Sequence, residues 1–315
     1  MNMAKNKNPA VSKNRLHSKK WESYKLFLYV LPCLIFIFIF NYLPLWGWAY
    51  SFFQYKPGLA LSDCKFVGLQ NFQALFGNAI MRENLFRVLR NTFGIQLLNY
   101  LLMPVPMLFA IFLSEVANTK FQKVVQTLTT LPHFISWVIM FSLAGCIFGS
   151  QGVLNSLLSN AGFGTIDILT TEKHVWIIQA LLNLWKNMGW NAIIYFAAIA
   201  GLDQEVYEAA MVDGATRWQK IRYITIPLLI PTFFVLLIMG IGNFLNSGID
   251  QFLTFGNAMN KEFIEVLDLY VYNLGIGNGQ ISFSVAVGIM KSLVALVLFA
   301  GANFASKKIR GTSVF

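Results

Sequence analysis

Charged residues are scarce in this chain of 315 residues, where they make up 12% of the sequence. Soluble domains usually carry about 25% charged residues, so a soluble surface of ordinary composition is excluded. Hydrophobic residues make up 56% of the chain and aromatic residues 15%. This composition also excludes a disordered chain and a collagen-like chain. It predicts an integral membrane protein.

Cysteine and histidine are also scarce, with three of each. Cys33 and Cys146 lie within apolar runs and Cys64 lies alone in a polar loop, which excludes a disulfide framework. The histidines lack the spacing of metal ligands, and the chain has no phosphate-binding loop and no HExxH or GxSxG motif. We therefore expect no metal site, no cofactor bound to this chain and no enzyme activity of its own.

Six apolar segments are long enough to cross a bilayer, which takes about 20 residues. The backbone must satisfy its own hydrogen bonds in lipid, so these segments are expected to be helices. The expected spans cover residues 26–46, 92–113, 124–148, 175–200, 224–245 and 283–304. Prolines 104, 106, 132 and 231 fall inside them and are expected to kink or unwind the helix locally. The predicted fold class is an all-α membrane protein with six transmembrane helices.

The positive charge is distributed unevenly between the two sides of these spans. The chain has 24 Lys and Arg against 14 Asp and Glu, a net charge of +10. With the N-terminus inside, roughly twice as many Lys and Arg lie in cytoplasmic as in external segments. We expect both termini in the cytoplasm, with a basic tail at 1–25, a transmembrane domain at 26–310 and a short tail at 311–315. Residues 1–20 of the basic tail show no periodicity. The charge then serves topology and contact with lipid headgroups, not nucleic-acid binding.

Two external loops are long. In the first, at about 47–90, Leu69, Phe72 and Phe76 recur at helical spacing and predict a short interfacial helix. The second spans about 246–282. Loops of this length either dock a partner or gate a path, or they form a packed cap.

The cytoplasmic loop at 201–223 predicts two short helices joined at a glycine. Asp203 is placed to cap the first helix, and Gly214 to end it in the left-handed conformation. Thr216 begins a capping box with the glutamine three residues later, which starts the second helix. Such a compact helix-turn-helix at the membrane face is suited to insertion into a cleft on another protein.

The same loop resembles the EAA signature of ABC importer permeases. That signature is Glu-Ala-Ala, three residues, Gly, nine residues, then Ile-x-Leu-Pro. The chain matches it at Glu208, Ala209, Ala210, Gly214, Ile224 and Pro227. The departure is Ile226, which stands where the signature has leucine.

This resemblance implies the type I ABC importer permease fold, with the loop as the coupling helix pair that docks into a groove of an ATPase subunit. It places Glu208 toward the ATPase and the turn at Gly214. The expected coupling residues are Glu208, Ala209, Ala210, Asp213, Gly214 and Arg217. ATP and Mg would then be bound by the partner ATPase.

Further segments, at 66–72, 91–93 and 185–195, resemble the carbohydrate branch of these permeases, which imports oligosaccharides or polysaccharide fragments. The resemblance implies a location in the bacterial plasma (inner) membrane. The implied partners are a second homologous permease, an ATPase dimer, an extracytoplasmic solute-binding protein, a saccharide substrate and membrane lipid.

The fourth expected span has a polar stripe that is a candidate substrate path. At 100° per residue, five polar or aromatic side chains fall within an arc of about 140°. They are Asn183, Lys186, Asn187, Trp190 and Asn191. Amides and an indole ring suit a saccharide, and Lys186 suits an acidic one, while polar groups avoid lipid. Asn243 and Asn246 near the end of the fifth span are weaker candidates.

Other interpretations of the sequence remain open. The polar stripe could be a contact between helices, with Lys186 paired to a carboxylate or to backbone carbonyls, or the span boundaries could be misplaced. Lys291 in the sixth span is expected to be structural. For the whole chain, the alternatives are an importer permease for another solute, an ATP-independent secondary transporter, and a membrane scaffold or sensor.

Overall fold

The structure is a computed structural model that describes the backbone of residues 10–310 and the side chains of residues 24–304. Within this range the regular structure is helical, and the single β-type contact is an isolated bridge between Phe53 and Phe66. The expected C-terminal tail at 311–315 and the first nine residues of the expected N-terminal tail lie outside the described residues.

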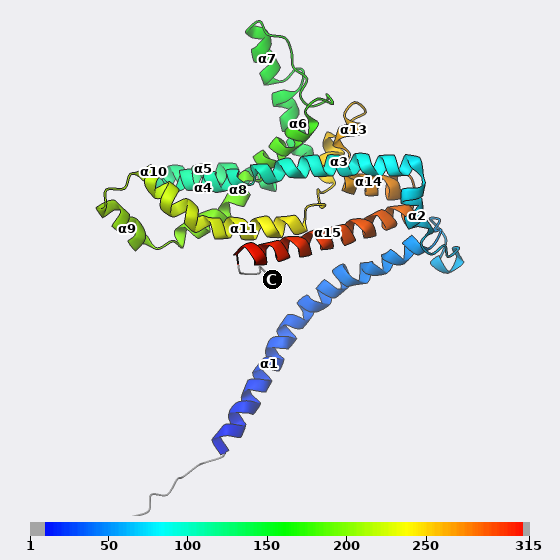
Figure 1. Cartoon of the computed structure of the whole chain (residues 1–315), viewed down its shortest axis with the longest axis horizontal. Coiled ribbons are helices and arrows are strands. Elements are labelled where there is room, and N and C mark those ends of the chain that lie inside the picture. The colour runs from blue at the N-terminus through cyan, green and yellow to red at the C-terminus, as the bar shows by residue number, and fades with distance from the viewer. Residues whose placement is uncertain (1–9, 311–315) are drawn as a thin grey trace, which may run out of the picture.

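The N-terminal helix α1 (Ala10–Ile37) leads away from the remaining helices, as Figure 1 shows in blue. It continues through a π-helical turn η1 (Phe38–Tyr42) into a 3-10 helix η2 (Leu43–Phe52). The expected basic tail at 1–25 is helical from Ala10 onward. The physical reason is that Lys, Arg, Leu and Glu favour helix, which the apolar segment beyond them propagates.

The short helix α2 (Gln70–Gly77) confirms the helix expected from the spacing of Leu69, Phe72 and Phe76. A single 3-10 turn η3 (Leu61–Asp63) precedes it. Helix α2 packs against α3 (Ala79–Leu102), which starts the helical bundle.

The bundle is built around the long helix α8 (Val175–Ala200), which packs against α3, α4 (Pro104–Ser114) and α5 (Thr119–Thr130). Helix α11 (Ile226–Gly242) packs against the last helix, α15 (Ile281–Arg310). These helices run side by side in Figure 1. Pro104 separates α3 from α4, as expected of a residue without an N–H group.

The third expected span, 124–148, is not one continuous helix. Helix α5 ends at Thr130, and a 3-10 turn η4 (Leu131–Phe134) and two extended residues precede α6 (Trp137–Phe148). Pro132 lies in that turn and lacks the N–H that a continuing helix needs. Helices α6 and α7 (Val153–Asn160) consequently leave the bundle at an angle (Figure 1).

Five stretches of the described helices are long and apolar enough to cross a membrane. They are Tyr24–Phe52, Ala79–Ser114, Trp137–Asn160, Arg217–Gly242 and Ile281–Phe304. The fourth expected span coincides with α8, a continuous helix of 26 residues whose apolar run is interrupted by the polar stripe. The count of six spans therefore stays a prediction.

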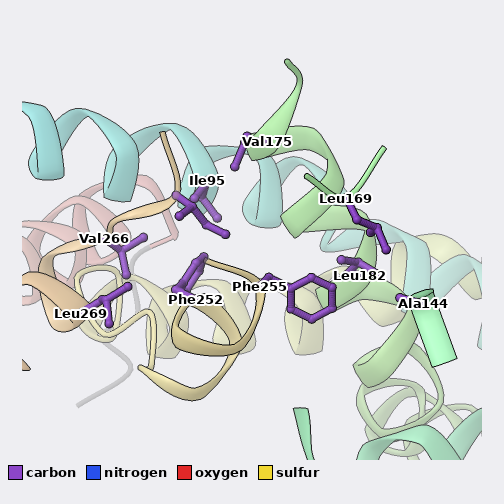
Figure 2. Close-up of a cluster of buried hydrophobic side chains, with 10 residues drawn as sticks. Ile95, Ala144, Leu169, Val175, Leu182, Phe252, Phe255, Val266 and Leu269 are labelled. Atoms are coloured by element: carbon purple, nitrogen blue, oxygen red, sulfur yellow. The ribbon is translucent and has the colours of Figure 1, made fainter. Parts of the chain in front are cut away.

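The last long loop, 246–282, packs into the bundle. This agrees with the packed cap, one of the alternatives expected for a loop of this length. It contains α12 (Asp250–Phe255), α13 (Lys261–Ile264), α14 (Leu267–Tyr272) and a π-helical turn η6 (Asn273–Gly277). Figure 2 shows its buried side chains Phe252, Phe255, Val266 and Leu269 meeting Ile95, Ala144, Leu169, Val175 and Leu182. This core fixes α3 and α8 relative to each other.

Candidate functional site

The loop at 201–223 folds as the sequence predicts. Helix α9 (Gln204–Val212) begins at Asp203, whose side chain accepts a hydrogen bond of 2.9 Å from the Glu205 N–H. The helix ends at Gly214, whose φ of +77° lies in the left-handed region. The Ala215 N–H, which donates to the Ala210 carbonyl at 2.9 Å, closes that end.

The second limb of the loop is α10 (Arg217–Lys220), which opens on a complete capping box. The Thr216 N–H donates to Gln219 Oε1 at 2.7 Å, and Thr216 Oγ1 accepts from the Gln219 N–H at 3.3 Å. A π-helical turn η5 (Ile221–Thr225) leads into α11. The hydroxyl groups of Tyr207 and Thr225, 2.9 Å apart, join the two limbs.

Most of this loop is exposed. Helices α9 and α10 lie at one end of the bundle and α2 at the other (Figure 1). Of the expected coupling residues Ala210 is half-buried, and those exposed are Glu208, Ala209, Asp213, Gly214 and Arg217. Apolar side chains are exposed beside them, with Val212 at 88% and Trp218 at 60%.

Side chains of the polar stripe on α8 form a continuous hydrogen-bonded chain with α3 and η4. His133 Nδ1 and Asn187 Oδ1 are 2.9 Å apart, and Asn187 Nδ2 donates to Asn183 Oδ1 at 2.7 Å. Asn183 Nδ2 donates to Asn99 Oδ1 at 3.2 Å, and Asn99 Nδ2 donates to Gln96 Oε1 at 2.9 Å. The stripe therefore faces other helices.

Lys186 is buried and bonded to backbone. Its Nζ donates to the carbonyls of Pro132 (2.9 Å), His133 (3.0 Å) and Ile135. The side chain is 7% exposed, and the Trp137 ring lies 5.4 Å from the ammonium. This geometry matches the alternative of a contact between helices, because Lys186 satisfies the carbonyls that the break after α5 leaves open.

Replacing Lys186 by methionine is expected to destabilise the protein by about 1–3 kcal/mol, because three partly buried carbonyls lose a charged donor. The measurement is the thermal unfolding midpoint of the purified protein in detergent, compared with that of Lys186→Arg. Arginine keeps the charge and the donors, so we expect a smaller loss. An unchanged midpoint for Lys186→Met contradicts this role.

Gly189 lets α5 approach α8 closely. A Cβ atom at this position would lie 2.3 Å from the Thr129 carbonyl carbon and 2.5 Å from the Thr130 nitrogen. These are backbone atoms, which cannot rotate away. The close contact therefore requires glycine, and it places η4 and its carbonyls beside Lys186.

Two residues of the stripe remain accessible. Trp190 is 43% exposed and stacks on the His133 ring with the centroids 4.3 Å apart. Asn191 is exposed and lines a cavity of about 340 Å³ between α3, α8 and α11. The polar residues lining this cavity are Gln96, Asn99, Tyr100, Asn183, Asn191 and Tyr195.

The two weaker candidates lie apart from this cavity. Asn243 and Asn246 are exposed just after α11, and Asn246 Nδ2 donates to Asn243 Oδ1 at 3.2 Å. The Asn246 carbonyl accepts a 3.5 Å bond from Gln96 Nε2, which links this turn to the amide chain.

Lys291 of α15 forms an ion pair with Asp268 of α14. The same carboxylate accepts hydrogen bonds from the N–H groups of Ser247 (2.8 Å) and Gly248 (3.1 Å). The pair thus ties the turn after α11 to α14 and α15. This agrees with the structural role expected for Lys291.

Comparison with known proteins gives the family. Residues 102–311 match the family described as "Binding-protein-dependent transport system inner membrane component". The chain belongs to this family. The permease is also 37% identical to Protein LplB of Bacillus subtilis (strain 168), over 95% of this chain and 92% of that protein.

Two further similarities extend over nearly the whole permease. It is 37% identical to the polygalacturonan/rhamnogalacturonan transport system permease protein YteP of Bacillus subtilis (strain 168), over 96% of this chain and 94% of that protein. It matches a chain in the crystal structure of a bacterial ABC transporter involved in the import of the acidic polysaccharide alginate. That match has a TM-score of 0.81 and 34% identity, covering 94% of this chain and 99% of the other. The permease thus shares the fold of an ABC importer permease.

The structure adds residues to the candidate site that sequence reasoning missed. Gln96 and Asn99 are polar residues three apart in an expected span, and that spacing was an available signal. His133 follows the proline that breaks the third span. Nothing in the sequence singles out Gly189 or Tyr195, because their roles depend on which backbone and which cavity lie beside them.

Proposed function

We propose that this permease is a transmembrane subunit of an ATP-driven, binding-protein-dependent importer of oligosaccharides. The observation that carries the proposal is the exposed helix-turn-helix at 201–223, which presents the EAA residues in a chain of this family. The saccharide class is supported by the names of similar permeases. YteP is named for polygalacturonan and rhamnogalacturonan, and AraP of Bacillus subtilis (strain 168), 30% identical over 90% of this chain, for arabinooligosaccharides.

In this proposal the loop is the docking surface for the ATPase. Val212 and Trp218 supply exposed apolar area, and Glu208 and Asp213 supply charge next to it. Anchors of this kind, an exposed aromatic with neighbouring apolar groups, are typical of protein interfaces. ATP and Mg are bound by the ATPase, and this chain contributes no catalytic residue.

The loop is rigid enough to transmit movement. Three features restrict its flexibility: the capping box, the hydrogen bond between Tyr207 and Thr225, and the direct continuation of α10 through η5 into α11. Movement of the docked ATPase therefore moves α8 and α11 together. Alternating access follows when this permease and a second, homologous one rock against each other.

We place the saccharide path along the accessible part of the stripe. Trp190 offers a ring for stacking and Asn191 an amide for hydroxyl groups. Asn183 and Asn187 position each other through their hydrogen bond, and Lys186 stabilises the break between α5 and α6 by donating to its carbonyls. Asn243 and Asn246 extend the path toward the outer side.

The remaining partners follow from the same assignment. A chain of the alginate transporter that this permease resembles (TM-score 0.82, 34% identity) was solved in complex with an alginate pentasaccharide-bound periplasmic protein. We infer an extracytoplasmic solute-binding protein here as well. We place the permease in a bacterial inner membrane with lipid contacts along its apolar helices and both termini in the cytoplasm.

The test is uptake by proteoliposomes that contain the complete importer. Arabino-, rhamnogalacturonan and alginate oligosaccharides are offered with ATP inside the vesicles and ionophores that abolish ion gradients. Uptake of at least one of them that requires ATP supports the proposal. Uptake that persists without ATP and stops with the ionophores favours a secondary transporter. Uptake of an amino acid or peptide instead favours the non-sugar alternative.

A further inference from the structure

A groove between α3 and the start of α8 combines a positive charge with an apolar wall. Its volume is about 560 Å³, and Arg90 lies at one end of its lining on α3. The apolar part of the lining includes Leu97, Leu98, Trp176 and Ile177. The groove shares no lining residue with the polar cavity between α3, α8 and α11. It is therefore a separate feature from the candidate substrate path.

Arg90 is exposed and lies against two aromatic rings. Its guanidinium carbon is 5.9 Å from the centre of the Trp176 ring and 5.4 Å from that of the Phe263 ring. Among the described residues, no carboxylate lies within 4 Å of it, and its side chain makes one hydrogen bond, of 3.4 Å, to Asn91 Oδ1. Most of the five N–H donors of this guanidinium are therefore free for a ligand.

The rings beside Arg90 are fixed in place. Trp176 Nε1 donates to the Phe263 carbonyl at 3.0 Å, which joins α8 to α13. The indole also packs against Gly94, where an added Cβ atom would lie 2.4 Å from Trp176 Cε3. Glycine at this position therefore leaves the room that the ring needs. The guanidinium is consequently held in place before any ligand arrives, which lowers the entropy cost of binding.

The groove lies at the depth of lipid headgroups. From Arg90 to Ser114, and from Trp176 to Ala200, the helical path covers about 24 residues, or about 36 Å. The hydrocarbon core of a bilayer is about 30 Å thick, and about 40–45 Å with the headgroup regions. Arg90 therefore reaches the headgroup region when the far ends of these helices lie at the opposite surface. Leu97 and Leu98 then lie about 11 Å deeper, among acyl chains.

We propose that this groove binds an anionic phospholipid, with its phosphate on Arg90 and an acyl chain along Leu97, Leu98 and Ile177. The inference goes beyond the proposed function and does not depend on which solute is transported. A planar guanidinium matches a phosphate through two parallel hydrogen bonds. A small soluble anion would leave the apolar wall unused, whereas a ligand with an anionic head and an apolar tail complements both ends of the groove.

Glu172, which also lines the groove, is the rival partner for Arg90. The two form no ion pair in the structure, and Lys173 beside Glu172 offsets its charge. The two explanations predict different effects of removing the carboxylate. If Arg90 serves only to pair with Glu172, neutralising either residue has the same effect. If Arg90 binds a lipid phosphate, neutralising Glu172 removes a repulsion and strengthens binding.

The test is lipid binding to the full-length permease, purified in detergent with the subunits that accompany it. Native mass spectrometry measures the apparent affinity for phosphatidylglycerol and, in parallel, for phosphatidylcholine with the same acyl chains. Arg90→Gln should lower the affinity for phosphatidylglycerol at least about tenfold, with little change for phosphatidylcholine. Its thermal midpoint without added lipid should stay close to that of wild type.

Three further variants isolate the cause. Arg82→Gln neutralises an exposed arginine of α3 outside the groove and should bind lipid as wild type does. Glu172→Gln should bind phosphatidylglycerol at least as well as wild type. Arg90→Lys keeps the charge beside the rings but not the planar fork, so it should show a smaller loss than Arg90→Gln.

Each other outcome counts against the proposal. Wild-type affinity of Arg90→Gln for phosphatidylglycerol overturns it, and so does wild-type affinity of Arg90→Lys if Arg90→Gln does not fold. An equal loss in Glu172→Gln assigns Arg90 to an ion pair with Glu172. Displacement of the lipid by inorganic phosphate alone indicates a site for a free anion. Loss of an accompanying subunit from Arg90→Gln but not from Arg82→Gln assigns the groove to a contact between proteins.

Discussion

Replacing Gly214 by valine is expected to lower ATP-dependent uptake at least about tenfold. Gly214 has a φ of +77°, and nothing lies within 4 Å of the position a Cβ atom would take. The cost is therefore purely one of backbone conformation, about 1–2 kcal/mol or more for a β-branched residue. The chain relieves it by changing the angle between α9 and α10, which moves the docking surface away from the ATPase. The measurement is uptake together with the amount of ATPase that co-purifies.

Two variants isolate the cause. Gly214→Asn adds a similar bulk, but asparagine tolerates the left-handed conformation, so this variant should retain most of the uptake. Gly201→Ala changes a glycine in the same loop whose Cβ would meet only ordinary contacts at 3.5 Å. It should behave as wild type. Equal loss in Gly214→Val and Gly214→Asn would instead indicate that bulk at the interface, and not backbone conformation, is what matters.

Replacing Gly189 by alanine is expected to destabilise the protein by about 3 kcal/mol or more. The new methyl group would overlap the Thr129 carbonyl at 2.3–2.4 Å and the Thr130 nitrogen at 2.5 Å. Overpacking against side chains costs about 1–3 kcal/mol, and here the obstacle is backbone of a neighbouring helix. Separating α5 from α8 also pulls the η4 carbonyls from Lys186. The measurement is the yield of folded protein and its thermal midpoint.

The matched control is Gly301→Ala in α15, where nothing lies within 4 Å of the added Cβ. Alanine is favoured over glycine in helices by about 1 kcal/mol, so this variant should be as stable as wild type or slightly more stable. Equal stability of the Gly189 and Gly301 variants would contradict the close approach of α5 to α8.

The local structure of the loop at 201–223 could be predicted from sequence because its determinants are local. Asp203, Gly214 and Thr216 act on backbone groups within three or four residues, so capping rules place them correctly. The apolar spans could also be located, because a long hydrophobic run has few alternatives. Pro132 predicted a kink or local unwinding in the third span, but it did not predict how many residues the break would cover.

The candidate site could be predicted only in part, because its geometry depends on neighbouring helices. Periodicity placed Lys186 and Asn191 on one face of α8. In the structure, however, Lys186 is hydrogen-bonded to backbone carbonyls, whereas Asn191 lines a cavity. Their difference comes from where η4 and α11 pack. Likewise, the sequence left open whether the loop after α11 packs as a cap, and it did not predict that Phe252 and Phe255 would enter the core. Such outcomes are set by tertiary packing and not by spacing.

In the proposed importer the loop at 201–223 docks onto an ATPase subunit. The most direct measurement is cross-linking in native membranes from a photoreactive amino acid placed at Val212, which is 88% exposed on that loop. We expect a cross-link between this permease and the ATPase subunit, and none from the same group at Leu59, which is exposed in the loop before α2. A permease that transports but forms no ATPase cross-link from Val212, or forms one equally from Leu59, would contradict docking through this loop.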